Sequence, residues 1–167
     1  LDYARPYEGE LEPLLVNDVI SRTVQLEETN RAHDVRFELA LDDDLPLVRA
    51  DAERLHQVFI NLVRNAVQAM NLEGHVRITT RHRKPRSRKD APGIVEISFR
   101  DNGPGIAETT LEKIFIPFFT TKSEGTGLGL PICQRIVQDM GGTIEDKANA
   151  PDDGTNFIVG MPACDPK

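Results

Sequence analysis

Apolar residues recur with the spacing of one buried helix face in three parts of the chain, 14–31, 51–69 and 127–140. Each part predicts a helix, and the glycine pair at 141–142 is expected to end the third one. The second part carries the longest apolar stripe, so its helix is expected to pack most deeply. The members of that stripe are Leu55, Val58, Phe59, Leu62, Val63, Ala66 and Ala69.

Apolar and polar residues alternate with a period of two in five other segments, which predicts strands. The segments are 35–41, 75–80, 94–99, 143–148 and 156–162. Alternation of this kind is typical of a sheet that buries one face and exposes the other. The sequence therefore predicts an α+β fold, a two-layer sandwich of a mixed, mostly antiparallel sheet with helices on one face.

Two segments interrupt these patterns. Residues 1–13 are rich in Pro and Glu and predict a linker, which leaves residues 14–167 as one domain. The apolar segment 111–122 contains Pro117, which argues against one long helix there. The chain does not begin with Met, so we expect a fragment of a longer protein.

Composition narrows the class of protein. Hydrophobic residues make up 39% and charged residues 28% of the 167 residues, as in a soluble domain with its own core. The net charge of −7 argues against a general nucleic-acid-binding protein. No apolar run is long enough to span a membrane, and the two cysteines lack metal-site spacing, so a cytoplasmic setting is expected.

Three amide side chains share one face of the second predicted helix. Asn61, Asn65 and Gln68 are four and three residues apart, which places them in line beside the apolar stripe. They either face solvent or bring amide oxygens to a hard cation such as Mg²⁺, which takes few protein ligands and keeps water and phosphate oxygens.

Two glycine-rich motifs follow. "DNGPGI" (101–106) lies just past a predicted strand, where it is either an ordinary turn or a place of close backbone approach to a ligand. "FFTTKSEGTGLGL" (118–130) puts hydroxyls and an ammonium group before glycines and a helix start, which together favour an anion site. The Walker pattern is absent from it.

Four motifs in this order resemble those of the ATP-binding domain of sensor histidine kinases of two-component systems. "FINLVRNAVQAM" resembles the asparagine box of that family, "DNGPGI" its first glycine box, "IFIPFFTTK" its phenylalanine box and "GTGLGLPICQRIVQDMGG" its second glycine box. "DGTNF" resembles the last short glycine motif. The match extends from about Pro46 to Pro162, is most similar to kinases of the nitrogen-regulation type, and implies a Bergerat-type ATP-binding fold.

The resemblance implies a role for each motif. Asn65 would be the Mg²⁺ ligand, Asn61 would support the phosphates or the metal shell, and Asp101 would bind the adenine amino group of ATP or ADP. Gln68 is neutral where many family members carry Lys or Arg, so Lys122 would hold more of the phosphate charge. Residues that would line the base pocket are Gly103, Gly105, Ile106, Ile114, Leu130 and Thr155. Residues that would form the phosphate loop or lid are Thr120, Thr121, Lys122, Gly125, Thr126, Gly127, Leu128 and Gly129.

The family transfers the γ-phosphoryl group to a histidine on a separate helical hairpin. None of the four histidines lies in a matching motif, and His33, at a strand start, is expected to be a surface or strand-end residue. The acceptor is therefore expected on a dimerisation hairpin upstream, with residues 1–13 as its tail and a response regulator as the further partner. A stand-alone ATPase or an anti-sigma type serine kinase of the same superfamily is the alternative, and a nucleotide-free interaction module is a third reading.

Six cations cluster between the strands at 75–80 and 94–99. This stretch is either a solvated hairpin tip, a docking patch for an acidic partner, or a contact for anionic lipid. The cations are Arg81, Arg83, Lys84, Arg86, Arg88 and Lys89.

Overall fold

The computed structural model describes residues 8–30, 32–88, 90–121, 127–148 and 154–164. One layer is a five-stranded sheet in the order β2-β4-β5-β7-β6. The pair β2 and β4 is parallel, and the other three neighbouring pairs are antiparallel, which confirms the predicted mixed, mostly antiparallel sheet. In sheet order the strands are β2 (Asp34–Ala40), β4 (Glu73–Arg83), β5 (Ile94–Asp101), β7 (Thr155–Pro162) and β6 (Thr143–Ala148).

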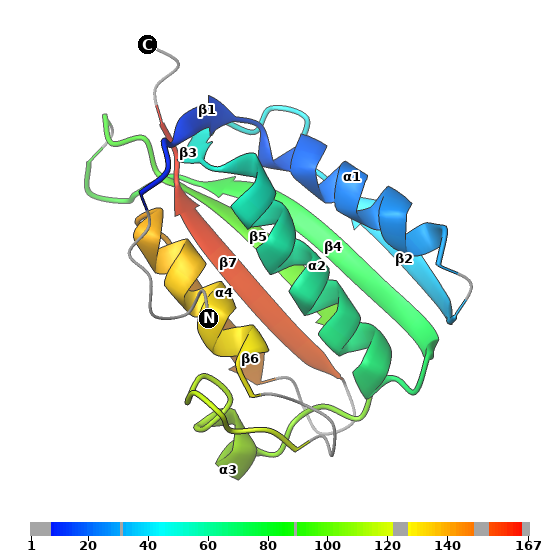
Figure 1. Ribbon diagram of the computed structural model, residues 1–167. Helices are drawn as coiled ribbons and strands as arrows, with labels where there is room; N and C mark the ends of the chain where they lie inside the picture. The colour runs from blue at the N-terminus through cyan, green and yellow to red at the C-terminus, as the bar shows by residue number, and fades with distance from the viewer. Residues whose placement is uncertain (1–7, 31, 89, 122–126, 149–153, 165–167) are drawn as a thin grey trace.

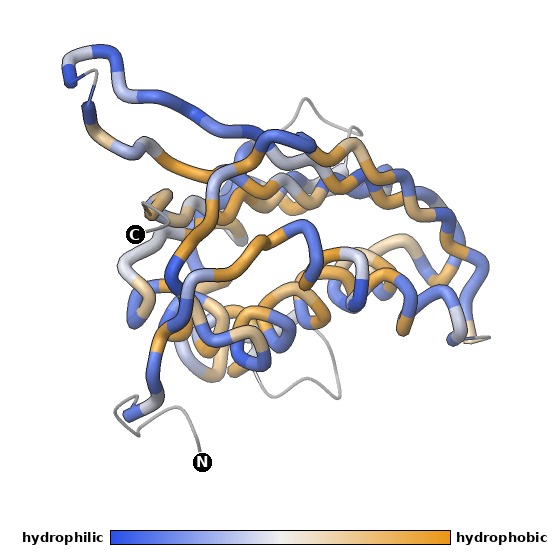
Figure 2. The backbone as a smooth tube through the Cα atoms, turned by 90° about the horizontal axis from the view of Figure 1, so that it is seen from above, coloured by the Kyte–Doolittle hydropathy of each residue, from blue (hydrophilic) through white to orange (hydrophobic). Residues whose placement is uncertain are grey.

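The second layer consists of helices on one face of this sheet (Figure 1). Seen from above, α1 (Val16–Glu28), α2 (Ala52–Ala69) and α4 (Gly129–Asp139) lie below the strands, and no described element covers the other face of the sheet (Figure 2). The short helix α3 (Glu108–Leu111) follows β5 at the end of the sandwich where the chain leads toward α4. The two-layer architecture is therefore the predicted one.

Helix α2 forms the centre of the helical layer because its start is capped and its apolar stripe is buried. The carboxylate of Asp51 accepts hydrogen bonds from the main-chain N–H groups of Glu53 (2.9 Å) and Arg54 (3.2 Å), as an N-cap residue does. Phe59 is fully buried, and its ring lies 5.3 Å from that of Phe99 on β5. The predicted stripe is buried up to Ala66, but Ala69 is exposed, because α2 ends there beside an open hollow.

Two short strands were not predicted. Strand β1 (Glu12–Leu14) pairs in antiparallel fashion with β3 (Val48–Ala50), so the boundary expected at residue 13 falls inside a paired strand. Strand β4 also extends to Arg83, which pairs with Ile94, so the first residues of the cation cluster belong to the paired strands of the β4–β5 hairpin. The origin of residues 1–13 as the tail of another helix stays a prediction. Within the described residues, no helix is long and apolar enough to cross a membrane.

His33 corrects part of one sequence expectation. It does precede a strand, but its side chain is only 4% exposed, and its ring lies 6.1 Å from that of Phe37 on β2. Its Nε2 atom lies 3.4 Å from the Glu27 carboxylate, which is itself buried and also accepts a hydrogen bond of 3.1 Å from the Arg64 Nε. The prediction of a surface or strand-end residue therefore holds for its strand-end position, while the side chain is buried rather than at the surface.

Candidate nucleotide-binding site

The carboxylate of Asp101 is the centre of the site. Asp101 is the last residue of β5 and is 6% exposed. Its Oδ1 atom accepts two main-chain hydrogen bonds, one of 2.9 Å from the Gly103 N–H and one of 3.2 Å from the Thr155 N–H. Both bonds end on the same oxygen, so the carboxylate is held in one orientation while Oδ2 is used by neither. A ligand with an N–H group can meet that second oxygen.

Burial raises the pKa of the Asp101 carboxyl above its ordinary value, and the two main-chain hydrogen bonds act in the opposite direction. The dominant cause is desolvation, which penalises the charged form. Each further hydrogen bond that such a buried carboxylate accepts lowers the free-energy cost of burying its charge. The carboxylate is therefore suited to an exocyclic amine, which would offset part of the desolvation.

Two glycines bring the loop after β5 against the start of β7. Gly105 and Gly154 have φ angles of +79° and +76°, a region that favours glycine. A Cβ atom on Gly105 would lie 3.2 Å from the Gly154 carbonyl oxygen, and one on Gly154 would overlap the main chain of Asp101. Gly154 was missing from the predicted site, although the motif "GTNF" that contains it was noted. Its small size is what allows Thr155 to reach Asp101.

The predicted lid has a defined base. The Phe118 N–H donates a hydrogen bond of 2.9 Å to the Gly127 carbonyl, so these two residues lie side by side. Both residues have left-handed φ angles, +68° for Phe118 and +71° for Gly127. A Cβ atom on Gly127 would lie 2.6 Å from the Phe118 Cα, so only glycine fits there. Lys122, Gly125 and Thr126, which were predicted in this loop, lie outside the described residues.

Helix α4 begins directly after this base. Leu128 is its N-cap residue and supplies no side-chain cap, so the N–H groups of Gly129 and Leu130 can face an anion, whereas Pro131 has no N–H to offer. Asn61 on α2 fixes the position of this turn, because its Nδ2 donates a hydrogen bond of 3.0 Å to the Gly129 carbonyl. Cys133, one turn further along α4, is buried, and burial raises the pKa of its thiol to about 12. This thiol is protonated at neutral pH and acts as a small apolar side chain.

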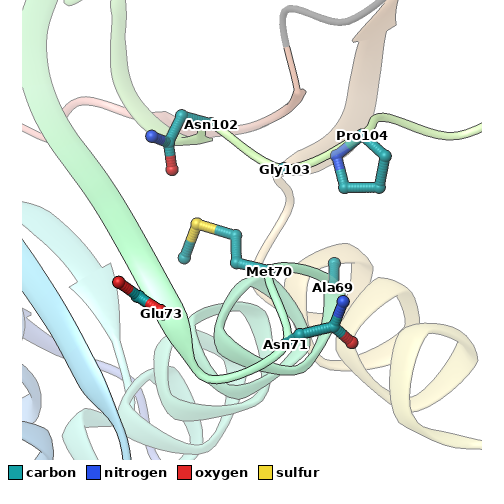
Figure 3. A pocket seen from close by; sticks show the side chains of 7 residues that line it. All are labelled: Ala69, Met70, Asn71, Glu73, Asn102, Gly103 and Pro104. Atoms are coloured by element: carbon teal, nitrogen blue, oxygen red, sulfur yellow. The ribbon is translucent and has the colours of Figure 1, made fainter.

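An open hollow of about 340 Å³ adjoins the Asp101 loop. Figure 3 shows Met70 and Asn71, at the end of α2, facing Asn102 and Pro104, which follow β5. The Asn102 side chain accepts a hydrogen bond of 2.9 Å from the His75 N–H and thereby joins this loop to β4. Sequence reasoning did not identify the hollow, since its walls come from two motifs that are far apart in the chain. Its lining residues are Ala69, Met70, Asn71, Glu73, Asn102, Gly103 and Pro104.

The other predicted site residues fall into two groups. Ile114 is buried, and Ile106 and Leu130 are half-buried and pack against the core, as apolar pocket walls do. Gln68, Thr120 and Thr121 are exposed. The structure thus brings Asp101, Gly103, Gly105 and Thr155 together, and it separately joins Asn61 to the start of α4.

Asn65 is half-buried on α2, one turn after Asn61. The described residues contain no group of three or more His, Cys, Asp or Glu side chains that could hold a metal ion by themselves. One amide oxygen from Asn65, with phosphate oxygens and water for the other positions, fits the needs of Mg²⁺. The donor set is therefore compatible with a metal that arrives with a nucleotide.

Comparisons with known proteins agree with this geometry. Residues 50–164 match the family described as histidine kinase-, DNA gyrase B-, and HSP90-like ATPase. The sensor histidine kinase ZraS of Escherichia coli O157:H7 is 36% identical over 163 residues, which cover 97% of this chain and 34% of ZraS. The sensory histidine kinase/phosphatase NtrB of Rhizobium leguminosarum bv. phaseoli is 37% identical over 161 residues, which cover 90% of this chain and 41% of NtrB. The chain thus spans about a third to two fifths of these relatives.

Solved structures give the same result. The nucleotide-free catalytic domain of the histidine kinase ThkA superposes with a TM-score of 0.77 at 37% identity, covering 93% of this chain and 97% of that one. Full-length ShkA in complex with AMPPNP has a TM-score of 0.76 at 27% identity and covers 96% of this chain and 33% of its own. ThkA in complex with the response regulator protein TrrA has a TM-score of 0.72 at 33% identity and covers 92% of this chain and 42% of its own.

A two-layer sandwich with a buried carboxylate between glycine turns and an uncapped helix start defines an ATP-binding catalytic domain. The chain belongs to the histidine kinase-, DNA gyrase B-, and HSP90-like ATPase family, as a catalytic domain of the histidine kinase kind.

Proposed function

We propose that this domain binds Mg-ATP and presents its γ-phosphoryl group to a histidine on a separate helical hairpin of the parent protein. The observation that carries the proposal is the fixed carboxylate of Asp101, whose Oδ1 is held by two main-chain N–H groups while Oδ2 can accept from the adenine amino group. The triphosphate would extend from there toward the first turn of α4. Lys122, Thr120 and Thr121 would hold it on the lid side.

Asn65 would ligate the Mg²⁺ ion, which when bound supplies positive charge between the phosphate groups. Asn61 would act differently, because its Nδ2 already binds the Gly129 carbonyl. It would hold α4 at a fixed distance from α2, so that the amides of the first turn face the phosphates. Positioning and electrostatics of this kind supply most of the catalysis in phosphoryl transfer.

The surroundings of the histidines favour an acceptor outside this sequence. His33 is buried against Glu27, His56 bonds to Thr23 (2.8 Å), and His82 bonds to the Pro92 carbonyl (2.7 Å). His75 pairs with Glu38 at 3.1 Å. Each is engaged away from Asp101, which supports transfer to a separate hairpin. By analogy with the ThkA complex, a response regulator would then be the partner that takes part in the next step.

The test uses the domain, Mg-ATP labelled on the γ-phosphate and the separately produced acceptor hairpin of the parent. We expect an acid-labile, base-stable phosphohistidine on the hairpin, and we expect Asn65→Ala to reduce it strongly. The rival reading, a stand-alone ATPase, predicts release of inorganic phosphate that is independent of the hairpin. If the domain binds ATP but the hairpin stays unlabelled, the kinase proposal is wrong.

A further inference from the structure

The face of the sheet that turns away from the helices carries an excess of cations. Residues such as Ile78 on β4 and Ile97 on β5 are fully buried toward the helices, so the residues that alternate with them point to the open side. Six of those are exposed cations, and five carboxylates share the face with them. We call this surface the basic face. Its cations are Arg36, Arg77, Arg81, Arg83, Arg100 and Lys147, and its carboxylates are Asp34, Glu38, Glu73, Glu96 and Glu145.

Two of these carboxylates are each shared by two basic side chains. Glu38 is shared between His75, at 3.1 Å, and Arg77, at 3.8 Å. Glu96 is likewise shared between Arg81, at 2.6 Å, and Arg83, at 3.5 Å. One acidic group therefore serves two basic ones in each case, and exposed pairs of this kind contribute little to stability.

The row of the basic face that begins at Glu38 has three cations and one carboxylate. Arg77 on β4 and Arg100 on β5 are directly opposite each other in the antiparallel register, and Lys147 lies further along the same row, beyond Asn156. Like charges directly opposite each other destabilise a strand pair. Within the part of the chain that the structure describes, Arg100 and Lys147 form no ion pair. This row costs the fold stability, which an anionic partner would restore.

The β4–β5 hairpin extends the basic face beyond the sandwich. Figure 2 shows its hydrophilic tip reaching past both layers. Lys84, Arg86 and Arg88 on this tip are exposed. The concentration of positive charge is notable because the whole chain has a net charge of −7.

The composition of the basic face indicates the kind of partner. Five of its six cations are arginines, whose planar guanidinium groups pair with carboxylates in two-point contacts. The interleaved glutamates favour a partner with a defined charge pattern rather than a uniform surface. The large apolar side chains that are exposed in the described residues, among them Leu26, Ile116 and Phe118, lie on the helix side or near the lid, so membrane insertion has no anchor here. The strands of the basic face carry no Phe, Tyr or Trp side chain on this side, so they offer no large ring for stacking unpaired bases.

We propose that the basic face is a docking surface for an acidic segment of a protein partner, which binds through arginine–carboxylate pairs centred on Arg77 and Arg100. This surface is on the opposite side of the sheet from the nucleotide site, so its use does not depend on the proposed kinase function. Binding is expected to weaken with salt, because the contacts are exposed ion pairs.

The test measures the fluorescence anisotropy of a short labelled polyglutamate peptide with the intact domain at low and at physiological ionic strength. The double variant Arg77→Gln with Arg100→Gln is compared with the control Arg22→Gln with Arg135→Gln. The control removes the same total charge from α1 and α4, and the side chains of Arg22, Arg135 and Arg77 are similarly exposed, at 48%, 40% and 52%. Mg-ATP binding serves as the check that each variant is folded.

We expect the domain to bind the peptide despite its net negative charge. The Arg77 and Arg100 variant should lose affinity by about fivefold, a typical effect of removing two exposed ion pairs, and the control should change it by less than about twofold. Three outcomes would overturn the proposal. They are no binding of polyglutamate by the wild type, an equal loss in both double variants, and tighter binding to phosphatidylserine vesicles or single-stranded DNA than to the peptide.

Discussion

The side chain of Asn61 on α2 donates a hydrogen bond of 3.0 Å to the main-chain carbonyl of Gly129, the first residue of α4. The two residues are so close that a Cβ atom on Gly129 would lie 3.0 Å from the Asn61 Oδ1. The asparagine motif and the second glycine motif are thus one structural unit, although 68 positions separate the two residues. Asn61 is accordingly a positioning residue for the helix start that would face the phosphates.

Replacing Asn61 by alanine should weaken nucleotide binding without unfolding the domain. The loss of one half-buried hydrogen bond should lower the free energy of unfolding by about 1 kcal/mol and loosen the first turn of α4. We expect the affinity for Mg-ATP, measured by calorimetry, to fall by about fivefold, which corresponds to roughly 1 kcal/mol.

Asn17→Ala is the matched control for this variant. Asn17 on α1 also donates from Nδ2 to a main-chain carbonyl, that of Asp42, at 2.9 Å, but it lies away from α4. Its Oδ1 also accepts a hydrogen bond of 3.1 Å from the Thr80 Oγ1, so this variant should cost at least as much in urea unfolding, and it should leave the Mg-ATP affinity unchanged. Equal losses of affinity in the two variants would mean that Asn61 acts through stability alone.

Gly127→Ala should disturb the base of the lid. The substitution puts a side chain at a φ angle of +71°, which costs roughly 1 kcal/mol, and it forces the chain apart at Phe118, where the new Cβ would be 2.6 Å from a Cα. We expect the Mg-ATP affinity to drop by more than about tenfold, since the start of α4 moves with Gly127.

Gly141→Ala separates the two effects of that substitution. Gly141, after the other end of α4, has a similar φ angle of +76°, but the nearest atom to its added Cβ is the Pro162 Cγ at 3.8 Å. This variant should lose stability in thermal unfolding and retain the Mg-ATP affinity of the wild type. A Gly127→Ala protein that binds Mg-ATP normally would show that the contact with Phe118 does not set the nucleotide site.

The stability of the apo domain should depend on pH through Asp101. Its folded-state pKa is raised by burial, so the folded protein holds this proton more tightly than the unfolded chain does. The contribution of Asp101 to stability therefore falls as the pH rises from the ordinary aspartate pKa through the raised one. Asp101→Asn removes this titration while keeping an oxygen for the Gly103 and Thr155 N–H groups.

Urea unfolding of the two apo proteins over this pH range measures the difference. We expect the variant to gain stability relative to the wild type as the pH rises, and the gain to level off above the raised pKa. A difference that stays constant with pH, or that changes in the opposite direction, would contradict a raised pKa for Asp101.

The buried carboxylate of Glu27 should stabilise the contact between α1, α2 and the start of β2. Glu27 is 2% exposed and contacts both Arg64 and His33. Glu27→Gln should therefore destabilise the domain by about 1.5 kcal/mol in urea unfolding, because the acceptor of the Arg64 hydrogen bond loses its charge while the exposed Arg64 stays solvated. Glu28→Gln, its exposed neighbour, should change the stability by less than about 0.5 kcal/mol. Equal effects would show that the burial of Glu27 contributes nothing.

Local patterns predicted most of the fold. The stripe from Leu55 to Ala66 and the alternation on β5 are properties of adjacent residues, so periodicity was enough to find α2 and the central strands. Strands β1 and β3 have only three residues each and are held by pairing with each other. The two segments are far apart in the chain, so the pattern of neighbouring residues could not reveal them. The extension of β4 to Arg83 was missed because its last residues are polar on both faces.

The candidate site was predicted in its parts and not in its connections. The motifs that contain Asp101 and Gly127 were visible as sequence, since their glycines and polar residues are unusual for a core. The hydrogen bond of Asn61 to Gly129 joins two residues that are far apart in the chain, and no sequence signal predicted it. The burial of the polar His33 side chain had no sequence signal either. Gly154 had a signal in "GTNF", but only the contact of its main chain with Asp101 shows why a glycine is needed.

The central claim is that Oδ2 of Asp101 accepts a hydrogen bond from the amino group of adenine. Calorimetry with Mg-ATP and Mg-ITP tests it most directly, because inosine carries an oxygen where adenine carries the amino group. We predict that the wild type binds Mg-ATP at least about tenfold more tightly than Mg-ITP, since an unmatched buried carboxylate is costly. Asp101→Asn, which places an N–H donor there, should reduce or reverse this preference. Equal affinity of the wild type for the two nucleotides would contradict the account.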